Sequence, residues 1–114
     1  MIDRLLRDAV NEMVDGLIDA DLGGRVYKKR IALPGRGKRG GARTIVGTNL
    51  QDRWFFVFGF EKSERANIDD RERAALQAVA KALLDMNDRM LDQAADEGEL
   101  MEIDDGDEEE PTAP

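Results

Sequence analysis

Apolar residues near the N-terminus recur at intervals of three and four positions, which predicts an amphipathic helix. The stripe comprises Ile2, Leu5, Leu6, Val10, Met13, Val14, Leu17 and Ile18. We expect the adjacent glycines Gly23 and Gly24 to end this helix, because glycine is common where helices stop. The chain therefore opens with a helix that has one face to bury.

Three strand-like runs follow this helix: RVYKKRIAL (25–33), ARTIVGT (42–48) and RWFFVFGF (53–60). The short segment NLQD joins the second run to the third and has the length of a hairpin connection. The third run is apolar on both faces, as in a strand that is covered on both sides or central in its sheet. Three short-linked strands predict an antiparallel meander.

Helical patterns return after residue 69. Asp69 and Glu72 have the spacing of a capping box, and the apolar positions that follow are Ala75, Leu76, Val79, Leu83 and Met86. A further short helix is expected after Asn87, through Met90, Leu91, Ala94 and Ala95, and LMEI (100–103) is a candidate for a short extra strand. The predicted fold is one α+β domain over residues 1–103, with a small antiparallel sheet packed with N-terminal and C-terminal helices.

The C-terminal end is acidic. From Asp96 onward there are ten acids, no bases and two prolines. Residues 104–114, DDGDEEEPTAP, are predicted to be a disordered tail, because they contain almost nothing to bury. Such a tail can simply keep the protein soluble, or it can mimic a polyanion and lie over a basic segment of the same chain.

The chain has a net charge of −8, and its charged residues are distributed unevenly along the sequence. Residues 1–24 carry two basic and six acidic groups, residues 25–65 carry eleven and three, and residues 66–114 carry four and sixteen. The middle segment can attract a polyanion although the whole chain is acidic.

The absence of cysteine and histidine from the sequence excludes disulfides, thiolate zinc sites and histidine acid–base catalysis, and we expect neither a metal nor another cofactor. No apolar run reaches the ~18 residues of a membrane span, and the N-terminus lacks the apolar core of a signal peptide. A cytoplasmic protein without membrane contact is expected.

The stretch PGRGKRGGAR (34–43) is a candidate for three kinds of phosphate-binding loop. A Walker loop requires Ser or Thr after its lysine and a helix after that, whereas Lys38 is followed by Arg39 and then by a strand-like run. The spacing of Gly35, Gly37 and Gly40 fits a dinucleotide fingerprint, but again a strand follows in place of a helix. The remaining interpretation is a mobile loop between strands that places several cations on a phosphate backbone.

Alternation along the first strand places Val26, Lys28 and Arg30 on one face and Tyr27, Lys29 and Ile31 on the other. Arg43 opens the second strand, while Lys62 and Arg65 follow the third. In a meander these basic groups can converge on one region of the sheet, although each could also be an ordinary solvated charge. The aromatic residues of 54–60 are expected in the core, which leaves Tyr27 as the better candidate for stacking on a base.

These residues resemble the RelE/HigB-type toxins of bacterial type II toxin–antitoxin systems, within the RelE/ParE superfamily. The resemblance lies in GLIDADLGGRVYKKRIALPGRGKRGGARTIV, in RWFFVFGFEKSERANIDDRE and in GELMEI, and covers about residues 12–103. It implies a cognate antitoxin, expected to be a small helix-turn-helix protein, and ribosome-dependent, metal-independent cleavage of mRNA. Compared with the family, the given sequence begins after the position of an N-terminal strand rich in aromatic residues. Either the start is misplaced, or this is a shortened form whose sheet has an exposed edge.

The resemblance also implies roles for individual residues. Arg43 would be the leading phosphate stabiliser, with Lys62 and Arg65 beside it as further catalytic groups. The predicted RNA-binding residues are Tyr27, Lys28, Lys29, Arg30, Arg36, Lys38 and Arg39. Clustered Lys and Arg can stabilise a phosphorane without metal or histidine.

Two classes of function remain open at this level. The first is the endoribonuclease just described. The second is a non-catalytic binding module, either a ParE-like gyrase inhibitor or an inactive remnant that binds only antitoxin or RNA.

Overall fold

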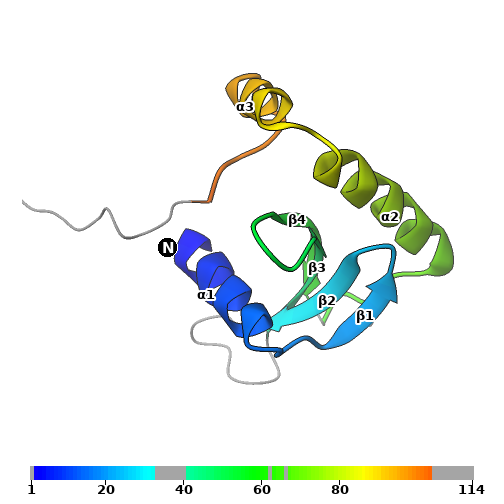
Figure 1. Cartoon of the computed structure of the whole chain (residues 1–114). Coiled ribbons are helices and arrows are strands. Elements are labelled where there is room, and N and C mark those ends of the chain that lie inside the picture. Colours follow the sequence, from blue (N-terminus) through cyan, green and yellow to red (C-terminus); the bar gives the residue numbers. More distant parts are fainter. Residues whose placement is uncertain (1, 33–40, 62, 66, 104–114) are drawn as a thin grey trace, which may run out of the picture.

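The computed structural model describes residues 2–32, 41–61, 63–65 and 67–103. Its elements, in chain order, are α1 (Ile2–Val14), β1 (Ala20–Gly23), β2 (Val26–Ile31), β3 (Ala42–Thr48), β4 (Trp54–Glu61), α2 (Asp70–Leu84) and α3 (Asp88–Asp96). The strands form one antiparallel sheet in the order β1-β2-β3-β4. The predicted α+β class and the three-strand meander are confirmed, and β1 adds a fourth strand at the edge (Figure 1).

The predicted end of the first helix is wrong. The helix stops at Val14, and Gly16 takes a positive φ of 95° directly after it. The N–H of Leu17 donates to the carbonyl of Glu12 (2.9 Å), which closes the last turn in the manner of a Schellman motif. Gly23 and Gly24, with φ values of 85° and 62°, instead form the turn from β1 to β2.

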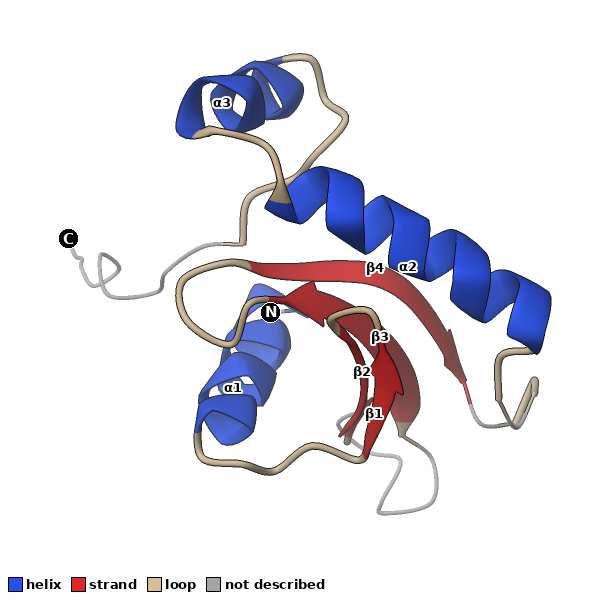
Figure 2. Ribbon diagram, turned by 45° about the vertical axis from the view of Figure 1, so that its right-hand side comes forward, coloured by secondary structure: helices blue, strands red, loops and turns tan. Residues whose placement is uncertain are grey.

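The two longer helices cover opposite faces of the sheet (Figure 2). On the α2 face, Val26, Ile45 and Phe60 pack with Ala80 in a buried cluster. A Cβ added to Gly47 would lie 2.7 Å from the Cβ of Ala80, so glycine allows α2 to approach β3 closely. On the other face, α1 packs against β2.

The C-terminal helices begin as predicted. Asp69 accepts from the backbone N–H of Glu72, whose side chain accepts in return from the Asp69 N–H, so the capping box is confirmed. Asn87 caps α3 with one bond, because its side-chain oxygen accepts from the backbone N–H of Met90. The candidate strand at 100–103 does not form: the N–H groups of Glu99 and Leu100 donate to the carbonyl of Ala94 and close the end of α3.

Arg53 joins the β3–β4 hairpin to the connection between α2 and α3. Its guanidinium donates to the carbonyls of Leu84 and Met86, and its Nη2 lies 3.0 Å from a carboxylate oxygen of Asp88. The bond to Leu84 gives an acceptor at the end of α2 a partner outside the helix. None of the helices in the described ranges combines the length and hydropathy needed to cross a bilayer.

Candidate RNA-binding face

Arg43 is the basic residue of β3 and lies beside the basic strand β2. It pairs across β2 with Arg30 and across β4 with Phe60, so all three side chains project from the α2 face of the sheet. Like charges directly opposite each other in neighbouring strands are unfavourable unless something neutralises them. The Nη1 atom of Arg43 is buried and has no hydrogen-bond partner among the described residues. An unmet buried donor is costly, so Nη1 of Arg43 would gain from an acceptor.

Lys28 lies on the same face, two residues before Arg30. It pairs with Ile45 of β3 and is half-buried. Lys28, Arg30 and Arg43 therefore come together from two strands, as the alternation along the sequence suggested.

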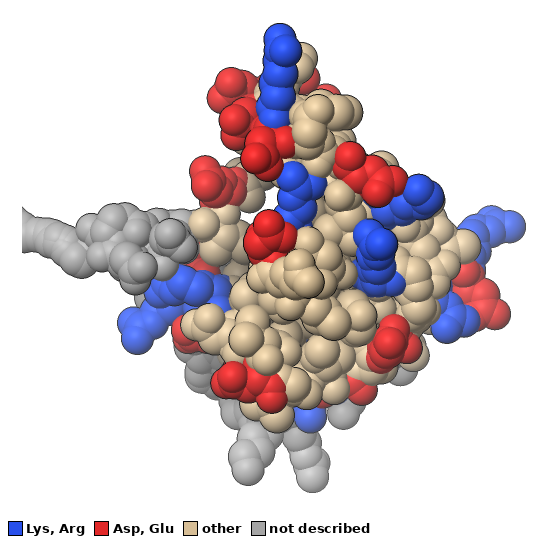
Figure 3. Space-filling view, in the orientation of Figure 1, with Lys and Arg blue, Asp and Glu red and all other residues tan. Residues whose placement is uncertain are grey.

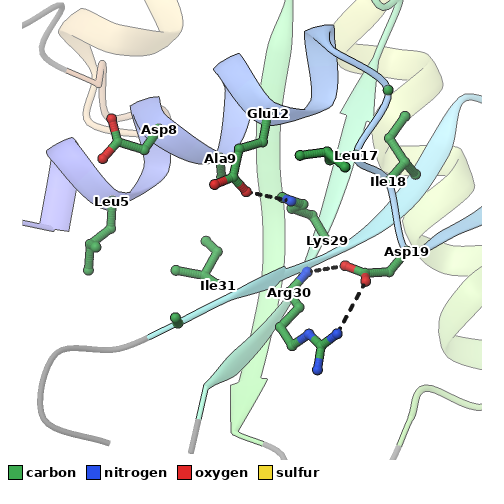
Figure 4. Close-up of a pocket in the computed structure, with 12 residues that line it drawn as sticks. Leu5, Asp8, Ala9, Glu12, Leu17, Ile18, Asp19, Lys29, Arg30 and Ile31 are labelled. Carbon is green, nitrogen blue, oxygen red and sulfur yellow. Dashed lines mark hydrogen bonds and ion pairs between the residues drawn. The ribbon is translucent and has the colours of Figure 1, made fainter. Parts of the chain in front are cut away.

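Arg30 is tethered but still open to solvent. Its backbone N–H donates to Oδ2 of Asp19, and its Nη2 lies 4.0 Å from Oδ1 of the same carboxylate (Figure 4). The side chain is 53% exposed. This distant ion pair leaves guanidinium N–H groups of Arg30 for an incoming anion.

Lys29 and Tyr27 lie on the opposite face. Lys29 is only 6% exposed, and its Nζ lies 2.7 Å from Oε1 of Glu12 on α1 (Figure 4). The pair lies in a groove of about 580 Å³ between α1 and β2, lined by Leu5, Ala9, Leu17, Ile18 and Ile31 among others. Lys29 therefore anchors α1 to the sheet, away from Arg43.

Hydrogen bonds hold the Arg65 side chain on the α2 face of the sheet. It donates from Nε to the carbonyl of Asn67 (3.1 Å), from Nη1 to Oε2 of Glu72 (2.9 Å), and from Nη2 to Oε1 of Glu72. The bond to Glu72 raises the pKa of Arg65. The same bond, followed by the one from the Asp69 backbone, lowers the pKa of Glu72. Arg65 thus lies beside the face with three of its five N–H groups already used and its charge paired with that of Glu72.

The other predicted site residues, Lys62, Arg36, Lys38 and Arg39, lie outside the described residues. Within the described ranges, no group of three or more acidic side chains is arranged to hold a metal ion. Figure 3 shows basic and acidic side chains interspersed on the side turned to the viewer, with acids gathered over α3. The basic site is therefore a local feature of the sheet.

A family model described as the RelE toxin of the RelE/RelB toxin–antitoxin system matches residues 1–103. The chain belongs to the RelE toxin family. Membership implies that this RelE toxin is one component of a type II toxin–antitoxin system and has a RelB antitoxin as its partner. A search of curated proteins finds no match.

The structure of this RelE toxin reveals two residues that the sequence interpretation missed. Glu72, identified only as a capping residue, also holds Arg65, and the close spacing of Arg65, Asp69 and Glu72 was the available signal. Phe58, expected in the core, is 36% exposed, whereas Phe60 is 6% exposed. Periodicity could not separate them because the whole run is apolar.

Proposed function

We propose that this RelE toxin is an endoribonuclease that cleaves ribosome-bound mRNA, with Lys28, Arg30 and Arg43 as its RNA-binding and catalytic face. The observation that carries the proposal is the buried, unpartnered Nη1 of Arg43 directly opposite Arg30. A bridging phosphate would give this donor an acceptor and relieve the repulsion between the arginines.

The cleavage uses the RNA's own 2′-hydroxyl. The hydroxyl gives its proton to solvent, its oxygen attacks the adjacent phosphorus, and the bond from phosphorus to the 5′-oxygen breaks. The leaving oxygen takes up a proton from solvent, which gives a 2′,3′-cyclic phosphate and a 5′-hydroxyl. Negative charge accumulates on the non-bridging oxygens of the phosphorane. The forked guanidinium of Arg43 is suited to donate two hydrogen bonds to these oxygens.

Neighbouring cations hold the strand in place. Lys28 and Arg30 contribute charge at neighbouring same-face positions of β2, and Arg65, although paired with Glu72, keeps two of its five N–H groups for the strand. Each phosphate contact of this kind makes binding weaker as salt rises. A steep salt dependence of RNA binding is therefore expected.

Induced expression tests the proposal. Wild-type toxin should arrest growth and cleave cellular mRNA, Arg43→Ala should relieve both effects, and co-expressed RelB antitoxin should restore growth. Arg71→Ala is the matched control, because Arg71 is exposed on α2. Growth arrest with intact mRNA would contradict the nuclease, and accompanying DNA damage would favour gyrase inhibition.

A further inference from the structure

Phe58 is an exposed aromatic ring beside the arginine site. It pairs with Ile45, while Phe60, two residues further along β4, pairs with Arg43. Phe58 therefore lies on the same face as Arg43 and one pair of positions away, at about 7 Å along the strands from the ~3.4 Å rise per residue. That spacing is within the reach of a single nucleotide.

Neighbouring groups fix the Phe58 ring. Its centroid lies 6.0 Å from that of Phe60, with the two planes inclined at 42°. The guanidinium carbon of Arg65 lies 6.0 Å from the Phe58 centroid and 5.5 Å from the Phe60 centroid. Because Glu72 holds Arg65 with two hydrogen bonds, the ring has a preset orientation, which lowers the entropy cost of binding.

The other aromatic candidates are less suitable. Tyr27 lies on the opposite face of β2, and Phe60 is buried beneath α2. Phe58 alone among these three combines exposure with the Arg43 face. An aromatic ring next to a cationic groove is the combination that single-strand binders use, with stacking on the ring and salt-sensitive contacts to the backbone.

We infer that Phe58 is a stacking platform for one nucleobase of the RNA whose scissile phosphate binds Arg43. This inference rests on the proposed nuclease function and adds a binding subsite to it. Stacking would orient the nucleotide and so position its phosphate for in-line attack. It tolerates any base, because every base has a π face, and it therefore gives affinity without strong sequence preference.

Ribosomes programmed with modified mRNA test the inference. Cleavage is measured as kcat/KM on an mRNA with a normal A-site codon, and on three versions that each lack one base of that codon. Phe58→Ala should lower kcat/KM on normal mRNA by about 5- to 150-fold, the range that corresponds to one stacked base. On the mRNA that lacks the stacked base, wild-type cleavage should fall similarly and Phe58→Ala should cause little further loss.

Companion variants separate stacking from folding. Phe58→Trp should retain cleavage, whereas Phe58→Leu, which keeps apolar bulk, should behave like Phe58→Ala. Phe56→Ala removes a ring from the same strand at a position paired with Val46 on the other face, and it should leave kcat/KM unchanged. Thermal unfolding of each variant checks that the fold is intact.

If Phe58→Leu lowers cleavage to the same extent on normal mRNA and on all three base-lacking mRNAs, the stacking inference is overturned. The proposed nuclease function would not be affected by that result. Retention of full activity by Phe58→Leu would overturn the stacking inference equally. Absence of cleavage by the wild-type protein would refute the proposed function and the inference together.

Discussion

The Lys29–Glu12 pair provides the sharpest test of how α1 is attached to the sheet. Glu12→Gln keeps the shape of the side chain but leaves the ammonium group of Lys29 facing a neutral amide in a mostly buried position. Lys29 has a side-chain exposure of 7% and Glu12 of 53%, with 2.7 Å between Nζ and Oε1. The pair therefore lies between the exposed and buried classes of salt bridge.

The magnitude follows from this intermediate position. At this distance the Coulomb attraction is ~1.5 kcal/mol in bulk water and ~6 kcal/mol at an effective dielectric constant of ~20. Desolvation of Lys29 offsets much of the larger value, so we expect Glu12→Gln to lower the free energy of unfolding by about 1–2 kcal/mol. For a domain of this size, that corresponds to a Tm lower by roughly 5–15 °C.

Thermal and urea unfolding, followed by circular dichroism, measure the effect. Asp8→Asn is the matched control, because it makes the same charge change at an exposed position on the same helix. Lys29→Met in the Glu12→Gln background should recover most of the lost stability, since an apolar chain can occupy the site without an uncompensated charge. Equal effects of Glu12→Gln and Asp8→Asn, or additive losses in the double variant, would refute the reasoning.

Two further variants test the other side of the sheet. Gly47→Ala should cost about 1–3 kcal/mol, because its Cβ would meet the Cβ of Ala80 at 2.7 Å; adding Ala80→Gly should restore part of that loss, and an unchanged urea midpoint in the single variant would contradict the close packing. Glu72→Gln should lower Tm at neutral pH, because the folded protein lowers the pKa of Glu72 through its bond to Arg65. A depressed carboxyl pKa stabilises the fold above the ordinary value of 4.5 and ceases to do so as pH falls through the depressed value. The Tm difference from wild type should therefore shrink in acid, and a constant difference from pH 7 to pH 3 would contradict the assignment.

Local signals in the sequence were sufficient for much of the fold. The Asp69–Glu72 capping box correctly predicted where α2 begins, because its reciprocal side-chain bonds to the backbone depend only on residues a few positions apart. The end of α1 was missed because Leu17 and Ile18 continue the apolar period. Both residues still line the groove beside α1 after the chain has turned at Gly16, although Leu17 is 60% exposed. An apolar period alone therefore does not show where the helical backbone ends.

The site was harder to predict than the fold. Alternation placed Lys28 and Arg30 together, and pairing with β3 brought Arg43 opposite Arg30. The same alternation separated Lys29 from them, but its ion pair with Glu12 depends on how α1 packs, which no local pattern encodes. Exposure of Phe58 likewise depends on how far α2 extends over the edge strand β4.

The central claim is that Arg43 stabilises the charge that develops during RNA cleavage. The most direct test is the single-turnover rate of mRNA cleavage on programmed ribosomes, compared between the wild-type toxin and Arg43→Ala at saturating toxin. We expect the rate constant to fall by about 10²–10³-fold, the usual effect of removing a donor that stabilises a transition-state anion, while the Tm stays close to that of the wild type. An unchanged cleavage rate in a folded Arg43→Ala protein would contradict the account.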